Sequence, residues 1–599
     1  MEEKDRIAPL IQSAACRIGD IGGAFAQSGA MSIREMTLRR AACQIFPHGV
    51  GWSQTERRGR RIMAVAIEGR SIDEVFRDAV GRWPEHDLVV APAIDGAPVR
   101  SLTYGQMAGL VEAHAAALRA AGYGAGQRAA VLLGATPEHY VIKLALNRLG
   151  MSCVPVNPDY RPAELAYLLE DSDAVLAIAD ERFEALMRAG ISEAKSNPEF
   201  VLYDNILSGI PDAPHEPDDV PIGPATEASL LYTSGTTGRP KGCILSHEYE
   251  LMVGQTYQNL GPPVALREGA DRVLNPLPAF HINSGILTFF GVMQTGNTLI
   301  QMERFSGATW WRDIQQTGAT VFHYLGVVIS VLLADRDVGP EVLGNLRAGL
   351  GAGVEPSLHV EFERRFGIPL IEAWGMTEMC RVVSMWEEPR RIDTRAMGRA
   401  FDGLDVRIVG EDGAELPRNT PGEMVIRHSQ ATPRKGFFSG YLNKPEATAE
   451  AWAGGWFHTG DTVIMDEEGV LFFVDRSKNI IRRSGENIAA AEVENVLFED
   501  TRVINVACIA APDEIREEEV MACIVLAPDV AATAETARAI FDRAFEKMAY
   551  FKPPGWILFI KELPVTGTQK VVKHQIFPND MDPRDSAGIH DFRKLKKRG

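Results

Sequence analysis

The chain has 599 residues, 45% of them hydrophobic, which is enough for one very large core or several smaller ones. Its formal net charge of −18 argues against a general affinity for nucleic acid or anionic membranes. No apolar run approaches the roughly 20 residues that a membrane-spanning helix needs, so we expect no membrane span. The seven cysteines are dispersed without a Cys-x-x-Cys pair, which argues against a disulfide framework or zinc site. We therefore expect a cytoplasmic protein.

The first 62 residues differ from the rest of the chain. They include a basic cluster at Arg57, Arg58, Arg60 and Arg61, whereas the remainder is strongly acidic. They lack the apolar core of a secretory signal. We expect residues 1–62 to form a weakly ordered extension, with Met63 as an alternative start. A regulatory or targeting arm is the competing interpretation.

Helical and strand-like runs alternate through the following part of the chain. Residues 104–121 and 139–149 have apolar side chains at helical spacing, and residues 128–133 form a short apolar run between them. This alternation predicts successive βαβ units. After about residue 393 short strand-like runs are separated by Gly, Asp and Pro turns, which indicates a β-rich subdomain.

The fold class predicted from these patterns is α/β. We expect a large domain of βαβ-type layers with its β-rich subdomain at residues 63–477. A smaller, mobile α+β domain is expected at residues 478–577, including a helix at residues 490–498. Residues 578–599 are expected to form a tail, whose last residues are basic.

Residues 232–242 form the most informative segment and read Tyr-Thr-Ser-Gly-Thr-Thr-Gly-Arg-Pro-Lys-Gly. Glycines let the backbone turn tightly and bring N–H groups close to an anion, hydroxyls add donors, and lysine adds a positive charge. This is not a Walker loop, because Lys241 is followed by Gly242 instead of Ser or Thr. The segment predicts a polyphosphate-binding loop. The expected contacts are Thr233, Ser234, Gly235, Thr236, Thr237, Gly238 and Lys241.

Two further segments carry the chemistry of a nucleotide site. Residues 372–378 read Glu-Ala-Trp-Gly-Met-Thr-Glu, in which a large aromatic beside glycine can form a stacking wall with room for an adenine. The acid that follows Thr377 can bind a hard cation. Asp461, directly after Gly460, can accept two hydrogen bonds from the vicinal hydroxyls of a ribose. Together they predict a site for ATP or AMP.

These segments resemble, in order and spacing, the signatures of adenylate-forming enzymes, a superfamily of acyl-CoA synthetases, luciferases and peptide-synthetase adenylation domains. The resemblance covers roughly residues 72–575. It implies that Glu378 and Thr236 hold Mg²⁺ and act in catalysis. The family usually has Tyr at the position of Trp374, so stacking is kept but the phenol hydroxyl is lost. The remaining implied nucleotide contacts are Ala352, Gly353, Ala373, Trp374, Gly375, Met376, Thr377, Asp461 and Arg476.

The resemblance also implies roles in catalysis and domain rotation. His281 would lie where the carboxylate substrate meets the nucleotide, and Lys570 would bridge that carboxylate and the α-phosphate. Lys478 would be the hinge about which the small domain rotates. Gly485 and Glu486 would lie on the CoA side after rotation.

The implied reaction is ATP-dependent ligation of a carboxylic acid to CoA, through an acyl-AMP, with Mg²⁺ as cofactor. Two alternatives stay open: a free-standing adenylation enzyme that loads a separate carrier protein, and a nucleotide-binding pseudoenzyme. The short tail after Lys570 argues against an attached carrier domain. The presence of Lys570 and Glu378 argues against a pseudoenzyme. A homodimer is an open option for the oligomeric state.

Within the CoA ligases, residues 277–283, 310–313 and 317–320 resemble the crotonobetaine/carnitine–CoA ligase group. We expect residues of the run 323–327 to line part of the acyl pocket. No Asp or Glu side chain is clearly placed to hold a trimethylammonium group, although Trp374 and Tyr324 are candidates for an aromatic cage. A medium-chain, alicyclic or aromatic acid is at least as compatible with the sequence. The expected pocket residues are Asn283, Tyr324, Leu325, Gly326, Gly349 and Gly351.

Overall fold

The computed structural model describes most of the chain, and these residues belong to one compact unit, Ile62–Gly599. The predicted extension at residues 1–62 lies outside them. In the described part no helix is long and apolar enough to cross a membrane. The described ranges are 64–93, 98–233, 239–380, 383–401, 403–476, 480–564, 571, 573–578 and 581–597.

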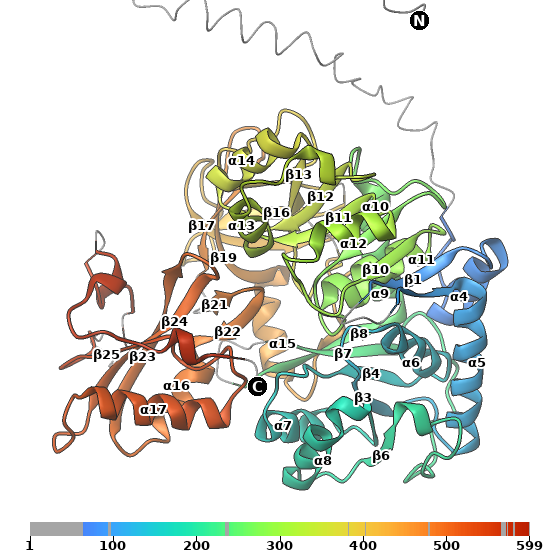
Figure 1. Cartoon of the computed structure of the whole chain (residues 1–599), viewed down its shortest axis with the longest axis horizontal. Helices are drawn as coiled ribbons and strands as arrows, with labels where there is room; N and C mark the ends of the chain where they lie inside the picture. Colours follow the sequence, from blue (N-terminus) through green and yellow to red (C-terminus); the bar gives the residue numbers. More distant parts are fainter. Residues whose placement is uncertain are drawn as a thin grey trace, which may run out of the picture. The chain divides into compact units, whose positions relative to one another are not determined.

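The first sheet has the strand order β18-β8-β7-β4-β3-β5-β6 (Figure 1). Its members β4, β3, β5 and β6 are parallel to their neighbours, and β7 is parallel to β4, whereas β8 and β18 are antiparallel. The helices between these strands confirm the predicted βαβ units. The strands are β3 (Arg128–Leu132), β4 (Ser152–Pro155), β5 (Leu176–Ala179), β6 (Glu199–Leu202), β7 (Glu227–Thr233), β8 (Lys241–Ser246) and β18 (Gly440–Tyr441).

Three helices of this part, those that begin at Ile72, Tyr104 and His247, start with a side-chain cap. The Thr103 hydroxyl accepts from the backbone N–H of Gln106, whose side chain accepts in return from the Thr103 N–H. Such reciprocal bonds satisfy donors that a helix start leaves unpaired. Helices α5 and α6 agree within two residues with the predicted runs 104–121 and 139–149. The helices are α4 (Ile72–Arg82), α5 (Tyr104–Ala120), α6 (Pro137–Arg148), α7 (Pro162–Ser172), α8 (Glu184–Glu193), α9 (His247–Gly254) and α10 (Thr256–Asn259).

The second sheet has the order β16-β17-β19-β20-β15-β14-β13-β12-β11-β9-β10-β1-β2. The run from β13 to β1 is parallel throughout. These strands are β1 (Asp87–Ala91), β9 (Arg272–Asn275), β10 (Thr298–Gln301), β11 (Val321–Leu325), β12 (Ala348–Ala352) and β13 (Leu370–Trp374), with β2 (Arg100–Thr103) antiparallel at the edge. Helices on this part are α11 (Phe289–Met293), α12 (Trp310–Thr317), α13 (Gly326–Ala334) and α14 (Pro356–Phe366).

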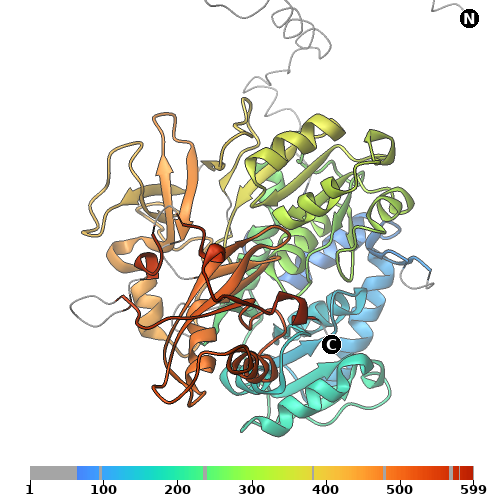
Figure 2. The same cartoon turned by 60° about the vertical axis from the view of Figure 1, so that its left-hand side comes forward.

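The other half of this sheet is antiparallel, which confirms the predicted β-rich region (Figure 2). It is joined to the parallel half through β13 and β14. Its elements are β14 (Val383–Ser384), β15 (Ala396–Ala400), β16 (Asp405–Val409), β17 (Gly422–Arg427), β19 (Phe457–Met465) and β20 (Leu471–Arg476), with helix α15 (Pro445–Ala451).

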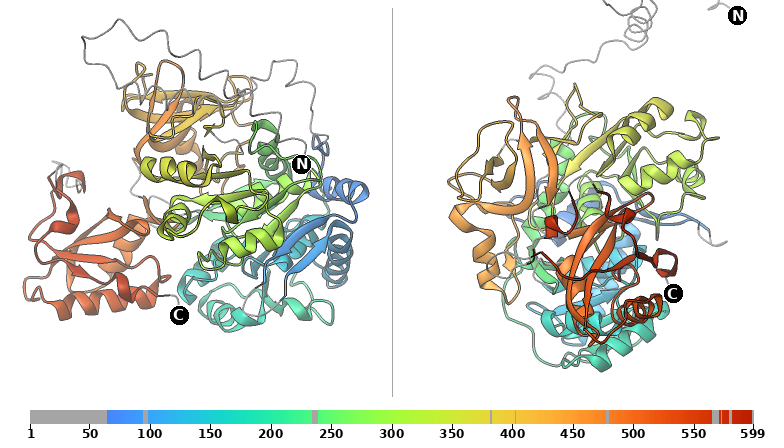
Figure 3. Two further views of the ribbon diagram at one scale, coloured as in Figure 1. Left: turned by 45° about the horizontal axis from the view of Figure 1, so that its top comes forward. Right: turned by 90° about the vertical axis from the view of Figure 1, so that its left-hand side faces the viewer.

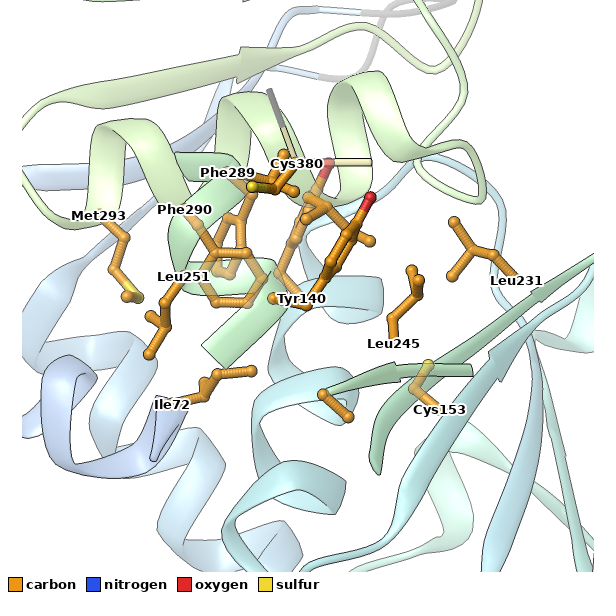
Figure 4. Close-up of a cluster of buried hydrophobic side chains, with 14 of the residues drawn as sticks. Ile72, Tyr140, Cys153, Leu231, Leu245, Leu251, Phe289, Phe290, Met293 and Cys380 are labelled. Carbon is orange, nitrogen blue, oxygen red and sulfur yellow. The ribbon is translucent and has the colours of Figure 1, made fainter. Parts of the chain in front are cut away.

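A large hydrophobic core joins helices and strands of the two sheets (Figure 4). Tyr140 of α6 stacks on Phe289 of α11 with ring centroids 4.4 Å apart. Ile72, Leu251 and Phe290 belong to the same fully buried cluster. Each such side chain contributes roughly 1.5–3 kcal/mol by leaving water. This core fixes the positions of the strand ends from which the site is built.

The last part of the chain forms a separate α+β layer (Figure 3). Helices α16 (Ala490–Phe498) and α17 (Ala534–Lys547) pack one hydrophobic cluster onto a sheet, and α16 has the predicted bounds. The large and small parts together confirm the predicted fold class. The strands are β21 (Ile480–Arg483), β22 (Glu486–Ala489), β23 (Val503–Asp513), β24 (Glu517–Leu526), β25 (Trp556–Phe559) and β26 (His590–Asp591).

Candidate active site

A cavity of about 220 Å³ opens where β11, β12 and β13 end. Ligands of open α/β sheets bind beyond the carboxyl ends of the strands, where the connecting loops diverge. The cavity is lined there by Leu325, Ala352, Gly353 and the residues that follow Ala373. The sequence-predicted adenine residues Ala352, Gly353, Ala373, Trp374, Gly375 and Met376 all line it.

The two ends of the predicted phosphate loop are held together by a β-hairpin. Thr233, the last residue of β7, pairs with Lys241, the first of β8. The Tyr167 hydroxyl donates to the carbonyl of Pro240 at 2.9 Å and fixes the return of the chain. The Lys241 ammonium lies 5.0 Å from the centroid of the Tyr441 ring. Ser234, Gly235, Thr236, Thr237 and Gly238 lie outside the described residues.

Glu378, the predicted metal ligand, is buried and held by a tyrosine. The Tyr441 hydroxyl donates to Glu378 Oε1 at 2.8 Å. Burial and the neighbouring Glu378 raise the pKa of Tyr441, which keeps the phenol protonated as a donor. Tyr441 lies on β18, which pairs with β8 directly after the loop. Glu378 and Lys241 are therefore both in contact with one residue that the sequence analysis missed.

Thr377, the predicted phosphate contact beside Glu378, is positioned through its backbone. Its carbonyl accepts a hydrogen bond of 2.7 Å from the Tyr249 hydroxyl. Tyr249 lies on α9, which follows β8. The segment with the metal-ligand candidate is thereby tied to the helix that follows the phosphate loop.

Trp374 and Asp461 contact each other directly. The Trp374 indole Nε1–H donates to Asp461 Oδ2 at 2.9 Å, and both residues are buried. The sequence predicts stacking for Trp374 and ribose binding for Asp461, but it does not predict the bond between them. The indole N–H is a polar function that the comparison with the family's Tyr overlooked. Asp461 pairs in register with Arg476, whose side chain is outside the description.

Glu372 holds the turn at residues 351–353 in place by a hydrogen bond. Its carboxylate accepts from the Tyr324 hydroxyl at 2.8 Å and from the Gly353 N–H at 2.9 Å. Burial raises its pKa. Gly353 has φ +74°, a conformation that favours glycine. Tyr324 lines the cavity together with Trp374, and its hydroxyl is bonded to Glu372.

His281 lies on a tightly built loop directly before Ile282 and Asn283, which line the cavity. Its side chain is 40% exposed, and Nε2 lies 3.5 Å from Glu486 Oε2. The loop is closed by the Gly285 N–H, which donates to the His281 carbonyl at 3.0 Å. A Cβ on Gly285 would lie 2.1 Å from the Ala279 carbonyl oxygen, so only glycine fits this approach. Asn283 begins a π-helix, Asn283–Thr288, and lines the cavity.

The predicted CoA-side residues form the turn between β21 and β22. Ser484 and Gly485 have φ of +51° and +90°. A Cβ on Gly485 would lie 2.5 Å from Leu325 Cδ1, so this turn packs closely against the cavity. Gly485 and Glu486 are thus brought to Leu325 and His281. Lys478 and Lys570, the predicted hinge and adenylation lysine, lie outside the described residues.

The predicted acyl-pocket residues divide into two groups. Asn283, Tyr324, Leu325 and Gly351 line the cavity, but Gly326 and Gly349 are not among its lining residues. Gly349 instead packs closely in the core, because a Cβ at this position would lie 2.7 Å from the Phe322 ring. The cavity also includes side chains that the sequence argument did not single out. They are Val253, Thr256, Leu287, Met379 and Cys380.

The fold and the site define a nucleotide-binding α/β enzyme with a smaller second part that borders the cavity. Family models agree: the AMP-binding enzyme model matches residues 76–442, and the AMP-binding enzyme C-terminal domain model matches residues 492–570. The chain belongs to this family, and the predicted adenylate-forming resemblance is confirmed.

Curated relatives confirm the predicted class of enzyme, an AMP-forming acid–CoA ligase. A sulfoacetate–CoA ligase of Cupriavidus necator is 30% identical over 82% of this chain and 94% of its own length. A crotonobetaine/carnitine–CoA ligase of Proteus mirabilis is 29% identical over 80% and 93%. An indoleacetate–CoA ligase of Aromatoleum aromaticum is 30% identical over 80% and 93%.

Solved structures show the same fold. The o-succinylbenzoate CoA synthetase of Bacillus subtilis, bound to a product analogue, has a TM-score of 0.73 at 24% identity, covering 85% of this chain and 98% of that chain. A fatty acyl CoA synthetase of Mycobacterium tuberculosis has a TM-score of 0.60 at 26% identity, covering 84% and 97%.

Proposed function

We propose that this protein activates a carboxylic acid with ATP and transfers the acyl group to CoA at the cavity described above. The observation that carries the proposal is one continuous cavity. It is bordered by Trp374, which donates to Asp461, continues past His323 and Leu350 between apolar side chains, and is flanked by the Gly485 turn. A nucleotide, an acid and a thiol would therefore bind in adjoining parts of this cavity.

The first half-reaction forms an acyl-AMP. A carboxylate oxygen attacks the α-phosphorus of ATP, the bond to the bridging oxygen breaks, and pyrophosphate leaves. Lys570 would balance the negative charge that builds on the α-phosphate and the carboxylate. Thr233 and Lys241, together with the loop between them, would hold the departing phosphates.

The buried carboxylate of Glu378 suits a bound Mg²⁺. One of its oxygens accepts from Tyr441 and the carboxylate keeps further lone pairs, which are the hard ligands that this ion prefers. We propose Glu378, with Thr236, as its protein ligands. The ion would supply positive charge to the phosphates, while Tyr441 keeps the carboxylate oriented.

Asp461 would bind the ribose and Trp374 would position it. Because the Trp374 indole donates to Asp461 Oδ2, the carboxylate is oriented before the nucleotide arrives, and it would then accept from a ribose hydroxyl. Gly353 and Gly375 border the space for the adenine. These residues bind every acyl-AMP alike, whatever the acid.

The second half-reaction forms the thioester. The thiolate sulfur attacks the acyl carbonyl, and the bond to the AMP oxygen breaks. Gly485 and Glu486 would border the incoming thiol, since their turn packs against Leu325 and His281. Rotation about Lys478 between the two steps would replace Lys570 by this turn, which makes it a gate on turnover.

We further propose that the protein works in the cytoplasm, where ATP and CoA are available. The described cysteines Cys153, Cys243, Cys380, Cys508 and Cys523 are buried thiols that are not in disulfide bonds, as expected in a reducing compartment. The oligomeric state, including a homodimer, stays an open prediction.

The half-reactions can be separated with two lysine variants. Lys570→Ala should lose acyl-AMP formation, measured as acid-dependent pyrophosphate release, and still convert supplied acyl-AMP and CoA to thioester. Lys478→Pro should do the reverse, because a rigid hinge blocks rotation but not adenylation. Equal damage to both half-reactions in both variants would contradict the assigned roles.

A further inference from the structure

We call the part of the cavity that is lined by Gly353, Trp374 and Gly375 the nucleotide end. From there the cavity continues toward the middle of the sheet. Strands β11 and β12 are parallel, with Leu325 opposite Ala352 and His323 opposite Leu350. His323 and Leu350 therefore lie two residues, roughly 7 Å, before the strand ends. We call this part the acyl end. Its lining residues are Val253, Thr256, Leu287, His323, Leu350, Met379 and Cys380.

No side chain of the acyl end carries a permanent charge. His323 is its one titratable basic group, and complete burial lowers its pKa to about 3, so it is neutral at physiological pH. The charged residues that line the cavity are Arg482 and Glu517, and both lie near the Gly353 end. A Cβ on Gly353 would be 3.8 Å from Arg482 Nη1 and 3.9 Å from Glu517 Oε1.

A hydrogen-bond network fixes His323 and assigns its proton. Thr288 Oγ1 accepts from Asn275 Nδ2 at 2.8 Å and donates to the Asn283 carbonyl at 3.0 Å. The Tyr257 hydroxyl is bonded to His323 Nε2, and its alternative acceptor, Thr288 Oγ1, is 3.4 Å away. The 3.4 Å separations of Thr288 Oγ1 from both Tyr257 and His323 Nε2 favour Tyr257 as the donor to Nε2, and this arrangement places the imidazole proton on Nδ1.

His323 Nδ1 has no hydrogen-bond partner among the described residues, although the side chain is fully buried. Leaving a buried donor unsatisfied is unfavourable, so such a group is usually completed by a ligand or an ordered water. His323 lines the cavity, and a bound acid whose oxygen reaches Nδ1 would supply the missing acceptor.

We propose that the acid substrate is mainly apolar, carries no charge besides its carboxylate, and presents one carbonyl or hydroxyl oxygen to His323 Nδ1–H. This inference rests on the proposed function. A fixed ammonium or sulfonate group would lose its hydration at the acyl end without gaining a counter-charge. A substrate oxygen would instead complete the hydrogen bonding of His323.

The charge part of the proposal is tested with two acids of the same shape. 5,5-Dimethylhexanoate and 4-(trimethylammonio)butanoate differ only in that a carbon replaces the charged nitrogen. With the full-length enzyme and Mg²⁺-ATP, the neutral acid should give kcat/KM for pyrophosphate release about 100-fold above the charged acid. Equal or reversed values would overturn the proposal.

The polar part is tested with oxo acids that have the carbonyl at successive carbons, each paired with its methyl-branched analogue, such as 5-oxohexanoate with 5-methylhexanoate. At least one oxo acid should be preferred over its partner by about tenfold. His323→Phe should make the two members of that pair equal, and Tyr257→Phe should weaken the preference. A preference that survives His323→Phe, or no preference in the wild type, would overturn the role of His323.

Failure of the substrate class and failure of the proposed function give different results. If no acid in any series causes pyrophosphate release or CoA-dependent AMP release, the ligase function itself is lost and the substrate class falls with it. If charged acids are turned over and neutral ones are not, the ligase function stands and only the substrate class is wrong. If His323→Phe does not fold, the Tyr257→Phe result decides the polar part.

Discussion

The nucleotide end and the acyl end of the same cavity are built in different ways. Around the nucleotide end, polar side chains form fixed pairs, Trp374 with Asp461 and Tyr441 with Glu378, and of these four residues Trp374 lines the cavity. The acyl end uses apolar side chains from strands and helices around one neutral histidine, His323. In the function we propose, one end binds the same nucleotide in every turnover, and the other selects the acid.

This difference predicts which kinetic constants each end controls. Variants at the nucleotide end should change turnover with every acid by a similar factor, because each acyl-AMP contains the same AMP. Variants at the acyl end should change the ranking of acids and leave the KM for ATP within about twofold. The predictions below test this division, beginning with the largest expected effect.

Glu378→Gln should lower acyl-AMP formation at least about 100-fold for every acid, since an amide cannot replace an anionic metal ligand beside the phosphates. The measurement is pyrophosphate release at saturating ATP over a range of Mg²⁺ concentrations. Tyr441→Phe is the matched control, because it keeps the ring beside Lys241 and removes only the bond to Glu378. We expect it to cost roughly five- to tenfold. A Glu378→Gln enzyme with normal Mg²⁺ dependence would contradict the assignment.

Leu350→Ala should shift the preference toward bulkier acids by about tenfold and leave the KM for ATP unchanged. Leu350 is 3% exposed, so its truncation should also cost about 2–5 kcal/mol of unfolding free energy. Leu299→Ala on β10 is the control, because Leu299 is equally buried but does not line the cavity. The control should lose stability without a change in acid preference. The same shift in both variants would show that lost packing, and not pocket shape, causes it.

Trp374→Phe should raise the KM for ATP roughly fivefold with all acids, because it removes the donor to Asp461 and keeps an aromatic ring. Trp456→Phe is a control for losing an indole elsewhere, since Trp456 contacts Arg407 and Arg427. In a double-mutant cycle with Asp461→Asn, the two changes should be strongly non-additive. Additive effects would mean that the hydrogen bond does not orient Asp461 for ATP.

The smallest predicted effect concerns Glu517, which lines the cavity from β24. Burial raises its pKa to about 7 from 4.5, although Arg482 acts in the opposite direction and Glu518 and Glu372 add to the rise. The neutral form is therefore favoured in the folded protein, and stability should fall as pH rises from about 4.5 to 7 and level off above.

Glu517→Gln should flatten the apparent melting temperature over that pH window. The exposed Glu546→Gln should follow the wild type. If Glu517→Gln keeps the wild-type slope, the pH dependence comes from other groups.

The sequence predicted the elements of the nucleotide end better than their contacts. Trp374, Glu378 and Asp461 each belong to a local segment with recognisable chemistry, so each could be assigned alone. The hydrogen bond from Trp374 to Asp461 joins residues 87 positions apart in the sequence. A single sequence does not show that residues so far apart come into contact. Tyr441 was missed for the same reason. Its only signal was a Gly-Tyr pair in a turn-rich region.

The acyl end was predicted only in part. Val253 and Thr256 come from α9 and α10, where apolar residues at helical spacing look the same whether they face a core or a cavity. His323 appeared only as one member of the run 323–327, because its unpaired Nδ1 depends on the positions of Tyr257 and Thr288. Gly349 was expected in the pocket, but packing against Phe322 explains its small size.

The most direct test of the central claim is release of AMP and pyrophosphate from ATP and Mg²⁺ with a panel of carboxylic acids, measured with and without CoA. The account predicts acid-dependent pyrophosphate release, CoA-dependent AMP release and a thioester product, with neutral apolar acids ranked first. Acid-dependent adenylate that does not respond to CoA would contradict the assignment as a CoA ligase. It would instead indicate a carrier protein or another acceptor.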